Sequence, residues 1–482
     1  MARHGADRHR PQRRAPLRSR SPGASLMRAL GLPSAGAGAR RDRAASLRRL
    51  ANSVAGSGVL LFGLKIAGCA LGLAMHLAFA RLLGAAAYGT FATAFNAAAL
   101  VALFAAGGLP LTASRFLPVY LSNGARAEAR AYLDTVAAAT VGGGLLGSGI
   151  LAAAAAMLGA DDPGLACALA AASPLVLLLA TAQTATALLQ ALHRPFAAEA
   201  AFLLVRPIAA TGMGAVLALP AFGLLDAVTA LIAVSLASLA ALLATADALR
   251  RAIARHALTA RGRPSLGVWV RPGLLLLFLV GGAALAERLD VMVVSAFADP
   301  EAAGIYSVAA RFAALISLGT AAATVRALPM LAEQLGRGDR DAAARTLAQA
   351  SRAALALAAA AGLGLAIAAG PLLGLFGAGF RSGTTALCLL AAAHMALAAG
   401  GAASTALIAS GNERRIATVT GLGILANVTA NLLLVPRFGM TGAAAATLAT
   451  MALTAFGLTL TARRVLGLAV FAGRDLRAED QA

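Results

Sequence analysis

Several charged side chains fall inside apolar stretches of this chain that are long enough to cross a membrane. They are Lys65, Arg206, Glu287, Arg288, Asp290 and Arg311. A charge at that depth costs several kcal/mol unless it faces a partner or a water-filled cavity. Lys65 stands out because it is the only lysine among 41 basic residues. The pattern is typical of a transport pathway through a bilayer.

The four cations suit an anionic substrate group. Arginine binds phosphate through its planar fork of donors, and lysine binds it as a point charge. Side chains that suit hydroxyl groups of a sugar accompany them, namely Asn96, Gln183, Gln190, Asn427 and Asn431. Glu287 and Asp290 are candidate coupling sites for a proton or a sodium ion, because an intramembrane carboxylate that is neutralised in one state acts as a switch.

The intramembrane charges in the second half of the chain also have explanations that involve structure alone and no substrate. Glu287 and Asp290 are candidate partners that would hold Arg288 in a structural network. Asp290 lies two residues away from Arg288, so the two do not share a helix face. Arg311 has the alternative of extending outward to the membrane interface. Counted along their spans, Arg288 and Arg311 fall in the outer half of the membrane.

Lys65 and Arg206 fall close to the midplane when residues are counted at 1.5 Å per residue. Glu199 is a candidate structural partner of Arg206, a turn or two away along the chain. No residue in the span of Lys65 neutralises it, and the midplane is too deep for easy snorkelling. Lys65 is therefore the hardest of these charges to explain by structure alone.

The chain has 482 residues, of which 60% are hydrophobic. Apolar runs of about 18 or more residues recur, and each is enough to span a roughly 30 Å hydrocarbon core. The predicted spans are 54–80, 88–109, 132–158, 164–192, 197–219, 223–247, 273–297, 303–328, 348–376, 384–410, 416–435 and 441–461. The connections leave no room for a soluble catalytic domain of about 100 residues. We expect an all-α integral membrane protein with about twelve transmembrane helices.

The net charge of +21 does not indicate nucleic-acid binding, because the arginines follow membrane sidedness. Most loop arginines fall after even-numbered spans, whereas loops after odd-numbered spans carry only Arg81, Arg381 and Arg437. The positive-inside rule then places both termini in the cytoplasm. Trp269, the only tryptophan, is expected at the cytoplasmic interface of the seventh span.

The N-terminus and the centre of the chain are basic. Residues 1–50 are rich in arginine, proline, glycine and serine, so we expect a disordered cytoplasmic tail that touches anionic lipid. Residues 51–249 form the expected N-terminal lobe, 250–272 a basic cytoplasmic linker, 273–464 the C-terminal lobe and 465–482 a second tail. Cys69, Cys167 and Cys388 lie singly in different spans and offer no metal site.

The second half of the chain repeats the first. AAAYGTFATAF at residues 85–95 corresponds to EAAGIYSVAARF at 301–312, with Gly89 and Gly304 before an aromatic residue in each. The following span ends in RFLP at 115–118 and in RALP at 326–329. Six spans in each copy give both copies the same orientation. We therefore expect two six-helix lobes related by a parallel pseudo-two-fold axis, with a substrate site between them near the midplane.

Residues 80–121, from ARLLGAAAYGTF to SRFLPVYL, resemble the opening module of the polysaccharide-biosynthesis flippases. This family belongs to the multidrug/oligosaccharidyl-lipid/polysaccharide exporter superfamily. ERLDVMVVSAFADPEAAGIYSVAARF, ALIASGNERR and ILANVTANLLLVPRFGMTGAAAATLATM are similar to further stretches of the family, in the same order. The resemblance covers roughly residues 50–465. It implies a bilobal protein of the bacterial inner membrane that moves an undecaprenyl-diphosphate-linked oligosaccharide from the inner to the outer leaflet. A polysaccharide polymerase or glycosyltransferases of the same pathway are implied partners.

Other functional classes remain as alternatives. A multidrug or cation antiporter of the same superfamily would share the fold, but such carriers usually have an acidic residue in the first lobe, where this chain has Lys65. A major-facilitator carrier would need an acidic-and-arginine loop after its second span, and LPLTASRFLPVYLSNGARAEARAY lacks it. There is no HExxH sequence, Walker sequence or acidic metal cluster, so we expect neither an enzyme nor a bound cofactor or metal.

Overall fold

The computed structural model describes residues 37–256, 262–263 and 265–471, and this part of the chain is helical almost throughout. Nine of its helices are long and apolar enough to cross a membrane. The predicted class, an all-α integral membrane protein, is confirmed. The elements are α2 (Ala37–Ala105), η1 (Leu109–Thr112), α3 (Ala113–Ser122), α4 (Arg126–Leu158), α5 (Pro163–Ala191), α6 (Pro195–Ala200), η2 (Ala201–Val205), α7 (Arg206–Leu217), α8 (Ala227–Ala254), α9 (Leu266–Phe297), α10 (Pro300–Val325), α11 (Ala327–Gly336), α12 (Arg340–Ile367), α13 (Ala369–Gly374), η3 (Ala378–Gly383), α14 (Thr384–Ala409) and α15 (Glu413–Leu466).

Helix α2 contains the first two predicted spans, joined at one glycine. Gly84 has φ 76° and ψ 173°, a conformation that glycine reaches without a steric penalty. The two stretches fold back on one another, and the rings of Phe79 and Phe91 lie 5.3 Å apart. Residues 1–36 of the predicted tail lie outside the described residues. Residues 37–50 are helical, because they are rich in alanine and arginine, which have high helix propensity.

Helix α15, near the end of the chain, likewise contains two predicted spans joined at one glycine. Gly439 breaks it with φ 55° and ψ −137°, between the two last predicted spans. The stretches before and after the glycine lie side by side, since Asn427 Nδ2 donates to Thr450 Oγ1 over 3.3 Å. Both breaks therefore fall where the sequence predicts the end of one span and the start of another. The total of about twelve spans stays a prediction.

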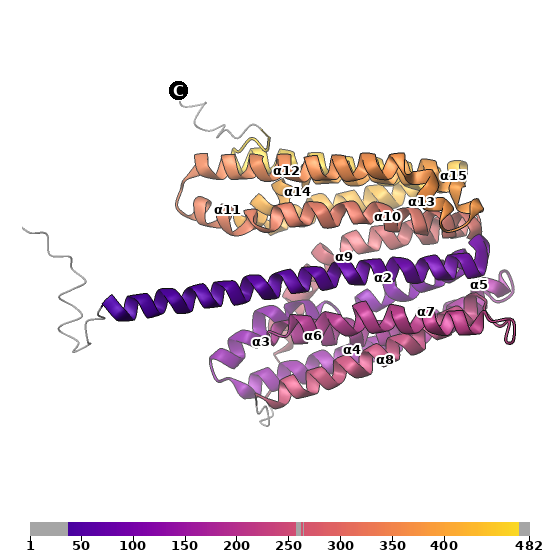
Figure 1. Ribbon diagram of the computed structural model, residues 1–482, viewed down its shortest axis with the longest axis horizontal. Coiled ribbons are helices and arrows are strands. Elements are labelled where there is room, and N and C mark those ends of the chain that lie inside the picture. Colours follow the sequence, from indigo (N-terminus) through magenta and orange to yellow (C-terminus); the bar gives the residue numbers. More distant parts are fainter. Residues whose placement is uncertain (1–36, 257–261, 264, 472–482) are drawn as a thin grey trace, which may run out of the picture. The chain divides into compact units, whose positions relative to one another are not determined.

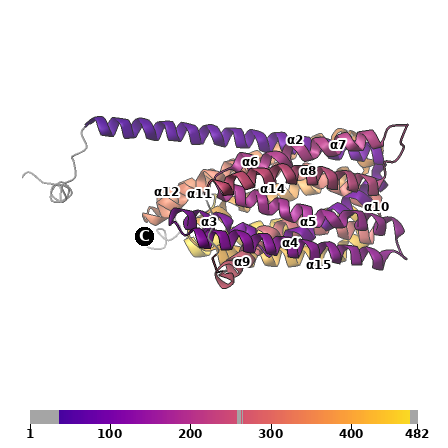
Figure 2. The ribbon, with the colours of Figure 1, turned by 90° about the horizontal axis from the view of Figure 1, so that it is seen from below.

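The helices of unit Gly63–Ala482 form two groups. In the first group α5 packs against α4 and α8, and α8 packs against α7. In the second group α14 packs against α10, α12 and α15. Figures 1 and 2 show the members of each group running alongside one another. We call these groups the first and the second lobe; the predicted residue bounds of the lobes stay a prediction. Arg352, on α12, donates a hydrogen bond to the Phe471 carbonyl oxygen, which follows the end of α15.

Helix α9 lies between the two groups in Figure 1 and contacts both. Its first turns pack against the first lobe, where a Cβ on Gly108 would overlap the carbonyl of Gly273. Trp269 is 1% exposed and its Nε1 donates to Tyr120 Oη over 3.0 Å. Aromatic residues of α3 and α4 therefore cover Trp269, and its expected depth at the membrane interface stays a prediction. The helix starts at Leu266, within the predicted linker, of which 257–261 and 264 lie outside the described residues.

Candidate functional site

Three arginines from the two lobes line one pair of cavities inside the bundle. The first cavity has a volume of about 390 Å³ and its polar lining residues are His76, Asn96, Arg206, Glu287, Arg288, Ser307 and Arg311. The second has about 400 Å³ and its polar lining residues are His76, Asn96, Gln183, Thr186, Glu199, Arg206, Arg288 and Arg311. The two share five of these residues, so they adjoin. We refer to both together as the cationic cavity.

Arg206 stands where the helix geometry changes. Pro207 has no N–H, so it cannot complete the helical hydrogen-bond ladder at that position. The preceding residues, Ala201–Val205, form one π-helical turn, and the Arg206 N–H bonds to the Ala201 carbonyl. Single π-helical turns inside α-helices are frequent at functional sites. The guanidinium carbon of Arg206 lies 5.9 Å from the ring centre of Phe202, within cation–π range.

The internal repeat places Asn96 and Arg311 at corresponding positions. Each lies seven residues after the glycine of its motif, Gly89 or Gly304. Both line the first and the second cavity. The sequence contains this correspondence, and it could have predicted that the two side chains meet. The repeat thus supplies an amide from one lobe and a guanidinium from the other.

The arginines of the cationic cavity are not paired with Glu199 or Glu287, the two carboxylates that line it. Within the described part of the chain, no ion pair involves Arg206, Arg288 or Arg311. The Nε atoms of Arg206 and Arg311 are buried without a hydrogen-bond partner. Glu287 lines the first cavity but pairs with none of the three. Like charges in a low-dielectric interior repel strongly, so this arrangement favours occupation by an anion.

Lys65 is not among the residues that line either cavity, and its role in substrate binding stays a prediction. Its Nζ lies 3.5 Å from Oε1 of Glu199, on α6, and its side chain is 50% exposed. Gln190 Nε2 donates to the same oxygen over 3.0 Å. Glu199 is therefore the partner of Lys65 and not of Arg206, because α6 brings its carboxylate beside α2. The carboxylate itself lines the second cavity together with Gln183.

Asp290, Asn427 and Asn431 are also not among the residues that line the cationic cavity, and the predicted roles of Asn427 and Asn431 in substrate binding and of Asp290 in ion coupling stay predictions. Asp290 is 2% exposed. It accepts hydrogen bonds from Tyr306 Oη at 3.0 Å, Asn431 Nδ2 at 2.9 Å and Thr447 Oγ1 at 2.7 Å. These contacts join α9, α10 and both stretches of α15. Asp290 therefore does not hold Arg288, and the two asparagines pack inside the second lobe.

Sequence reasoning missed polar residues that line the cationic cavity. His76 looks like an isolated polar core residue in the sequence, yet it lines both cavities, and its Nδ1 lies 3.1 Å from Tyr88 Oη. Ser307 and Thr186 line one cavity each. Ser307 stands one position after Tyr306 of the repeated motif, which is the only sequence signal we find for it.

Residues 54–334 match the family described as "Polysaccharide biosynthesis protein". The search of curated proteins gives no match. An inward-facing multidrug resistance MATE family transporter of the MOP superfamily is similar over 82% of this chain and 94% of its own, with TM-score 0.64 and 14% identity. The lipid II flippase MurJ, in an inward closed conformation, matches over 84% and 87%, again with TM-score 0.64 and 14% identity.

A third solved structure, a variant of the Vibrio cholerae MATE transporter VcmN, covers 87% of this chain and 99% of its own, with TM-score 0.55 and 14% identity. At such identities the likenesses show the fold alone. The family match covers more than half of the chain. This membrane protein, with the fold seen in MATE transporters and MurJ, belongs to the polysaccharide biosynthesis protein family.

Proposed function

We propose that the protein is a flippase that moves an undecaprenyl-diphosphate-linked oligosaccharide across the bacterial inner membrane. The observation that carries the proposal is the convergence of Arg206, Arg288 and Arg311, from both lobes, on one cavity without paired carboxylates. A diphosphate supplies negative charge that balances the three arginines, and guanidinium groups bind it through several hydrogen bonds at once. The family match supports a role in polysaccharide synthesis.

Alternating access fits the way the two lobes share the cavity. Arg206 comes from the first lobe and Arg311 from the second, so a bound diphosphate bridges them. Asn96 and Gln183 supply amide groups for sugar hydroxyls. Lys65 remains a predicted contact at the edge of this site, where a phosphate would replace Glu199 as its partner. Movement of one lobe against the other then exposes the same site to either side of the membrane.

The orientation is proposed from the arginine distribution. Both termini lie in the cytoplasm, and the substrate enters from the cytoplasmic leaflet. One of the similar structures, MurJ, is described as a flippase for lipid II. A lipid-linked oligosaccharide is the corresponding substrate class here. A polysaccharide polymerase and glycosyltransferases of the same pathway are proposed partners, since they would consume and supply that substrate.

We place the coupling ion at Asp290. Its carboxylate is buried and has three hydrogen-bond donors but no cationic partner in the described part of the chain. The Oδ1 atoms of Asn427 and Asn431 are buried nearby without partners. A proton or a sodium ion would neutralise the carboxylate, and the amide oxygens suit a sodium ion as ligands after rotation of the amides. Glu287, which lines the first cavity, is the second candidate.

The competing function is an ion-coupled exporter of cationic drugs. Its support is the shared fold with MATE transporters. The cationic cavity opposes it, because three arginines without paired carboxylates repel a cationic cargo. The two functions differ in the sign of the transported charge, which makes them separable by experiment.

The test is flipping by purified protein in proteoliposomes, with a fluorescent undecaprenyl-diphosphate-linked N-acetylglucosamine as the probe. Arg206→Gln or Arg311→Gln should slow flipping by about tenfold or more, since a lost hydrogen bond to a charged group costs roughly that factor. Arg130→Gln is the matched control, because the Arg130 side chain is 42% exposed and its ion-pair partner among the described residues is Asp134 on the same helix.

Two outcomes would overturn the proposal. One is unchanged flipping when Arg206, Arg288 and Arg311 are all replaced by glutamine in a protein that remains folded. The other is uptake of ethidium by the wild-type protein without any flipping of the probe, which would favour the drug exporter. Folding itself should survive the triple replacement, because it removes charges inside the bundle that form no ion pair with another described residue.

A further inference from the structure

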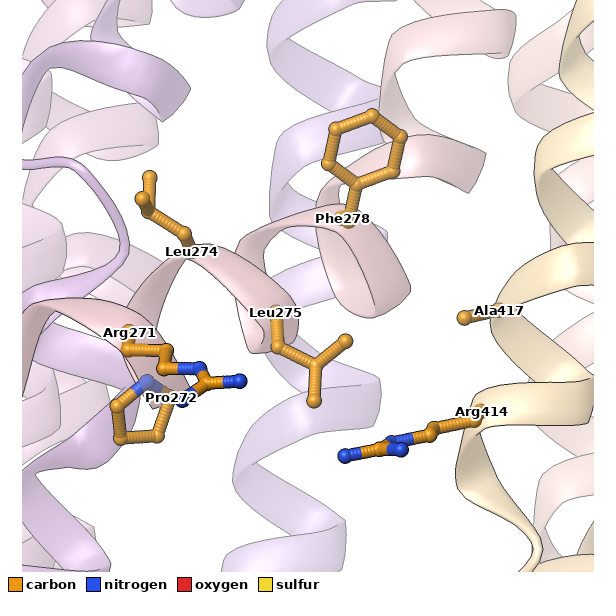
Figure 3. A pocket seen from close by; sticks show the side chains of 7 residues that line it. All are labelled: Arg271, Pro272, Leu274, Leu275, Phe278, Arg414 and Ala417. Atoms are coloured by element: carbon orange, nitrogen blue, oxygen red, sulfur yellow. The ribbon is translucent and has the colours of Figure 1, made fainter.

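A second pocket with two arginines lies between α9 and α15, away from the cationic cavity. Its volume is about 720 Å³. The residues that line it are Arg271, Pro272, Leu274, Leu275, Phe278, Arg414 and Ala417. Figure 3 shows the side chains of Arg271 and Arg414 extending toward one another from the two helices, with Leu275 between them. None of these residues lines the cationic cavity.

The pocket forms because α9 and α15 diverge toward their first residues. Farther along α9 they are in close contact, since a Cβ on Gly282 would overlap the side chain of Ile424. The opposite side of α9 is held against the first lobe by the contact of Gly273 with Gly108. The hydrogen bond from Trp269 to Tyr120 holds the same turn. The α9 side of the pocket is therefore packed against the first lobe.

The pocket combines charge with exposed apolar surface. Phe278 is 69% exposed and Leu274 is 50% exposed, on a helix that runs into the membrane. Arg271 and Arg414 form no ion pair or side-chain hydrogen bond with another residue that the structure describes. Phe278 lies seven residues along α9 from Arg271, or roughly 10 Å at 1.5 Å per residue. That spacing matches a lipid phosphate and the first part of its acyl chain.

We propose that this pocket binds one anionic phospholipid of the cytoplasmic leaflet. Its phosphate lies between Arg271 and Arg414, and one acyl chain covers Leu274, Leu275 and Phe278. Basic pockets between transmembrane helices on the cytoplasmic side are suited to such headgroups. The assignment of the leaflet rests on the orientation proposed above. The binding itself does not depend on flipping activity.

The test measures lipid binding, not transport, so that its failure is distinct from failure of the proposed function. The full-length protein is purified, stripped of lipid and titrated with phosphatidylglycerol or phosphatidylcholine, and bound lipid is counted by native mass spectrometry. The wild type should bind one phosphatidylglycerol about tenfold more tightly than phosphatidylcholine. The double variant Arg271→Gln/Arg414→Gln should lose this preference.

The matched control is Arg415→Gln/Arg464→Gln, which removes the same charge from exposed positions outside the pocket. It should keep the preference for phosphatidylglycerol. Equal binding by the wild type and the Arg271→Gln/Arg414→Gln variant would overturn the proposal, as would an equal loss in the control. Phe278→Ser should weaken binding of phosphatidylglycerol but not fold stability, because Phe278 is mostly exposed.

Two competitors identify the occupant. Inorganic phosphate at millimolar concentration should not displace phosphatidylglycerol, because it lacks the acyl chain. Undecaprenyl diphosphate should not displace it at a concentration below that of the phospholipid. Displacement by phosphate alone would show an anion site, and displacement by a trace of undecaprenyl diphosphate would show a substrate-loading site. Either result would contradict a phospholipid site.

Discussion

Gly89 and Gly304 lie backbone to backbone, where the two copies of the repeated motif meet. A Cβ on Gly304 would lie 2.9 Å from the Gly89 nitrogen, and a Cβ on Gly89 would lie 3.0 Å from the Gly304 nitrogen. The pair is symmetric, so the pseudo-two-fold axis passes close to it. Arg81 Nε donates to the Leu375 carbonyl nearby, again from one lobe to the other. The lobes are closed against each other at this end.

We predict that Gly89→Ala destabilises this closed arrangement. The added methyl group would overlap the carbonyl of Pro300, which is backbone and cannot move alone. Overpacking of this kind costs about 1–3 kcal/mol. The melting temperature in detergent should therefore fall. Gly142→Ala is the control, because a Cβ there meets nothing within 4 Å. Equal melting temperatures for the two variants would contradict the close packing of Gly89.

The sequence predicted the fold well because the bilayer restricts it. An apolar run of about 20 residues has to be helical in lipid, so span positions follow from composition. The single-glycine turns at Gly84 and Gly439 could be placed only between spans. The repeat predicted that Gly89 and Gly304 correspond, but a direct contact between them depends on how the lobes close.

The candidate site was less predictable, because its contacts join distant residues. Asp290 is bound by Asn431 and Thr447, which lie 141 and 157 positions away. Lys65 pairs with Glu199, on another helix. Charge alone does not tell a cavity-lining residue from one that packs inside a lobe. Arg206, Arg288 and Arg311 were expected to act together, and the structure places all three at the cationic cavity.

We predict that Asp290 makes thermal stability depend on the coupling ion. A ligand that binds only the folded protein stabilises it in proportion to the logarithm of its concentration. Raising sodium from about 1 to 100 mM at fixed ionic strength, or lowering the pH, should raise the melting temperature of the wild type. Asp290→Asn should remove this response and also lower stability by about 1–3 kcal/mol, since two donors point at one carboxylate oxygen and one at the other, and an amide N–H₂ in either place faces a donor.

Glu287→Gln is the control for the Asp290 variant, because it removes the other candidate carboxylate. It should keep the ion response of the wild type. A sodium or pH response that survives in Asp290→Asn and disappears in Glu287→Gln would move the coupling site to the first cavity. Differential scanning fluorimetry of detergent-purified protein is sufficient for all three proteins.

We predict the membrane orientation from accessible positions that the structure identifies. Cysteine in place of Gly164 or Ser382 should react with an impermeant maleimide in intact cells. Cysteine in place of Asn123 should react only after permeabilisation. All three positions are exposed. The background must lack Cys69, Cys167 and Cys388. Labelling of the Asn123→Cys variant in intact cells would reverse the proposed orientation.

The last prediction separates two roles of Lys65. If the lysine only balances Glu199, then Lys65→Met alone should impair the protein and Lys65→Met/Glu199→Gln should restore it, with a coupling energy of up to about 1 kcal/mol. If it also contacts the substrate diphosphate, the double variant should regain stability but not flipping. We expect the second result, with surface polymer lost in cells that carry either variant at normal membrane abundance.

Lys65→Arg should keep part of the activity, because it preserves the charge. Normal polymer in the double variant would exclude Lys65 from substrate binding and leave the phosphate to the arginines of the cationic cavity.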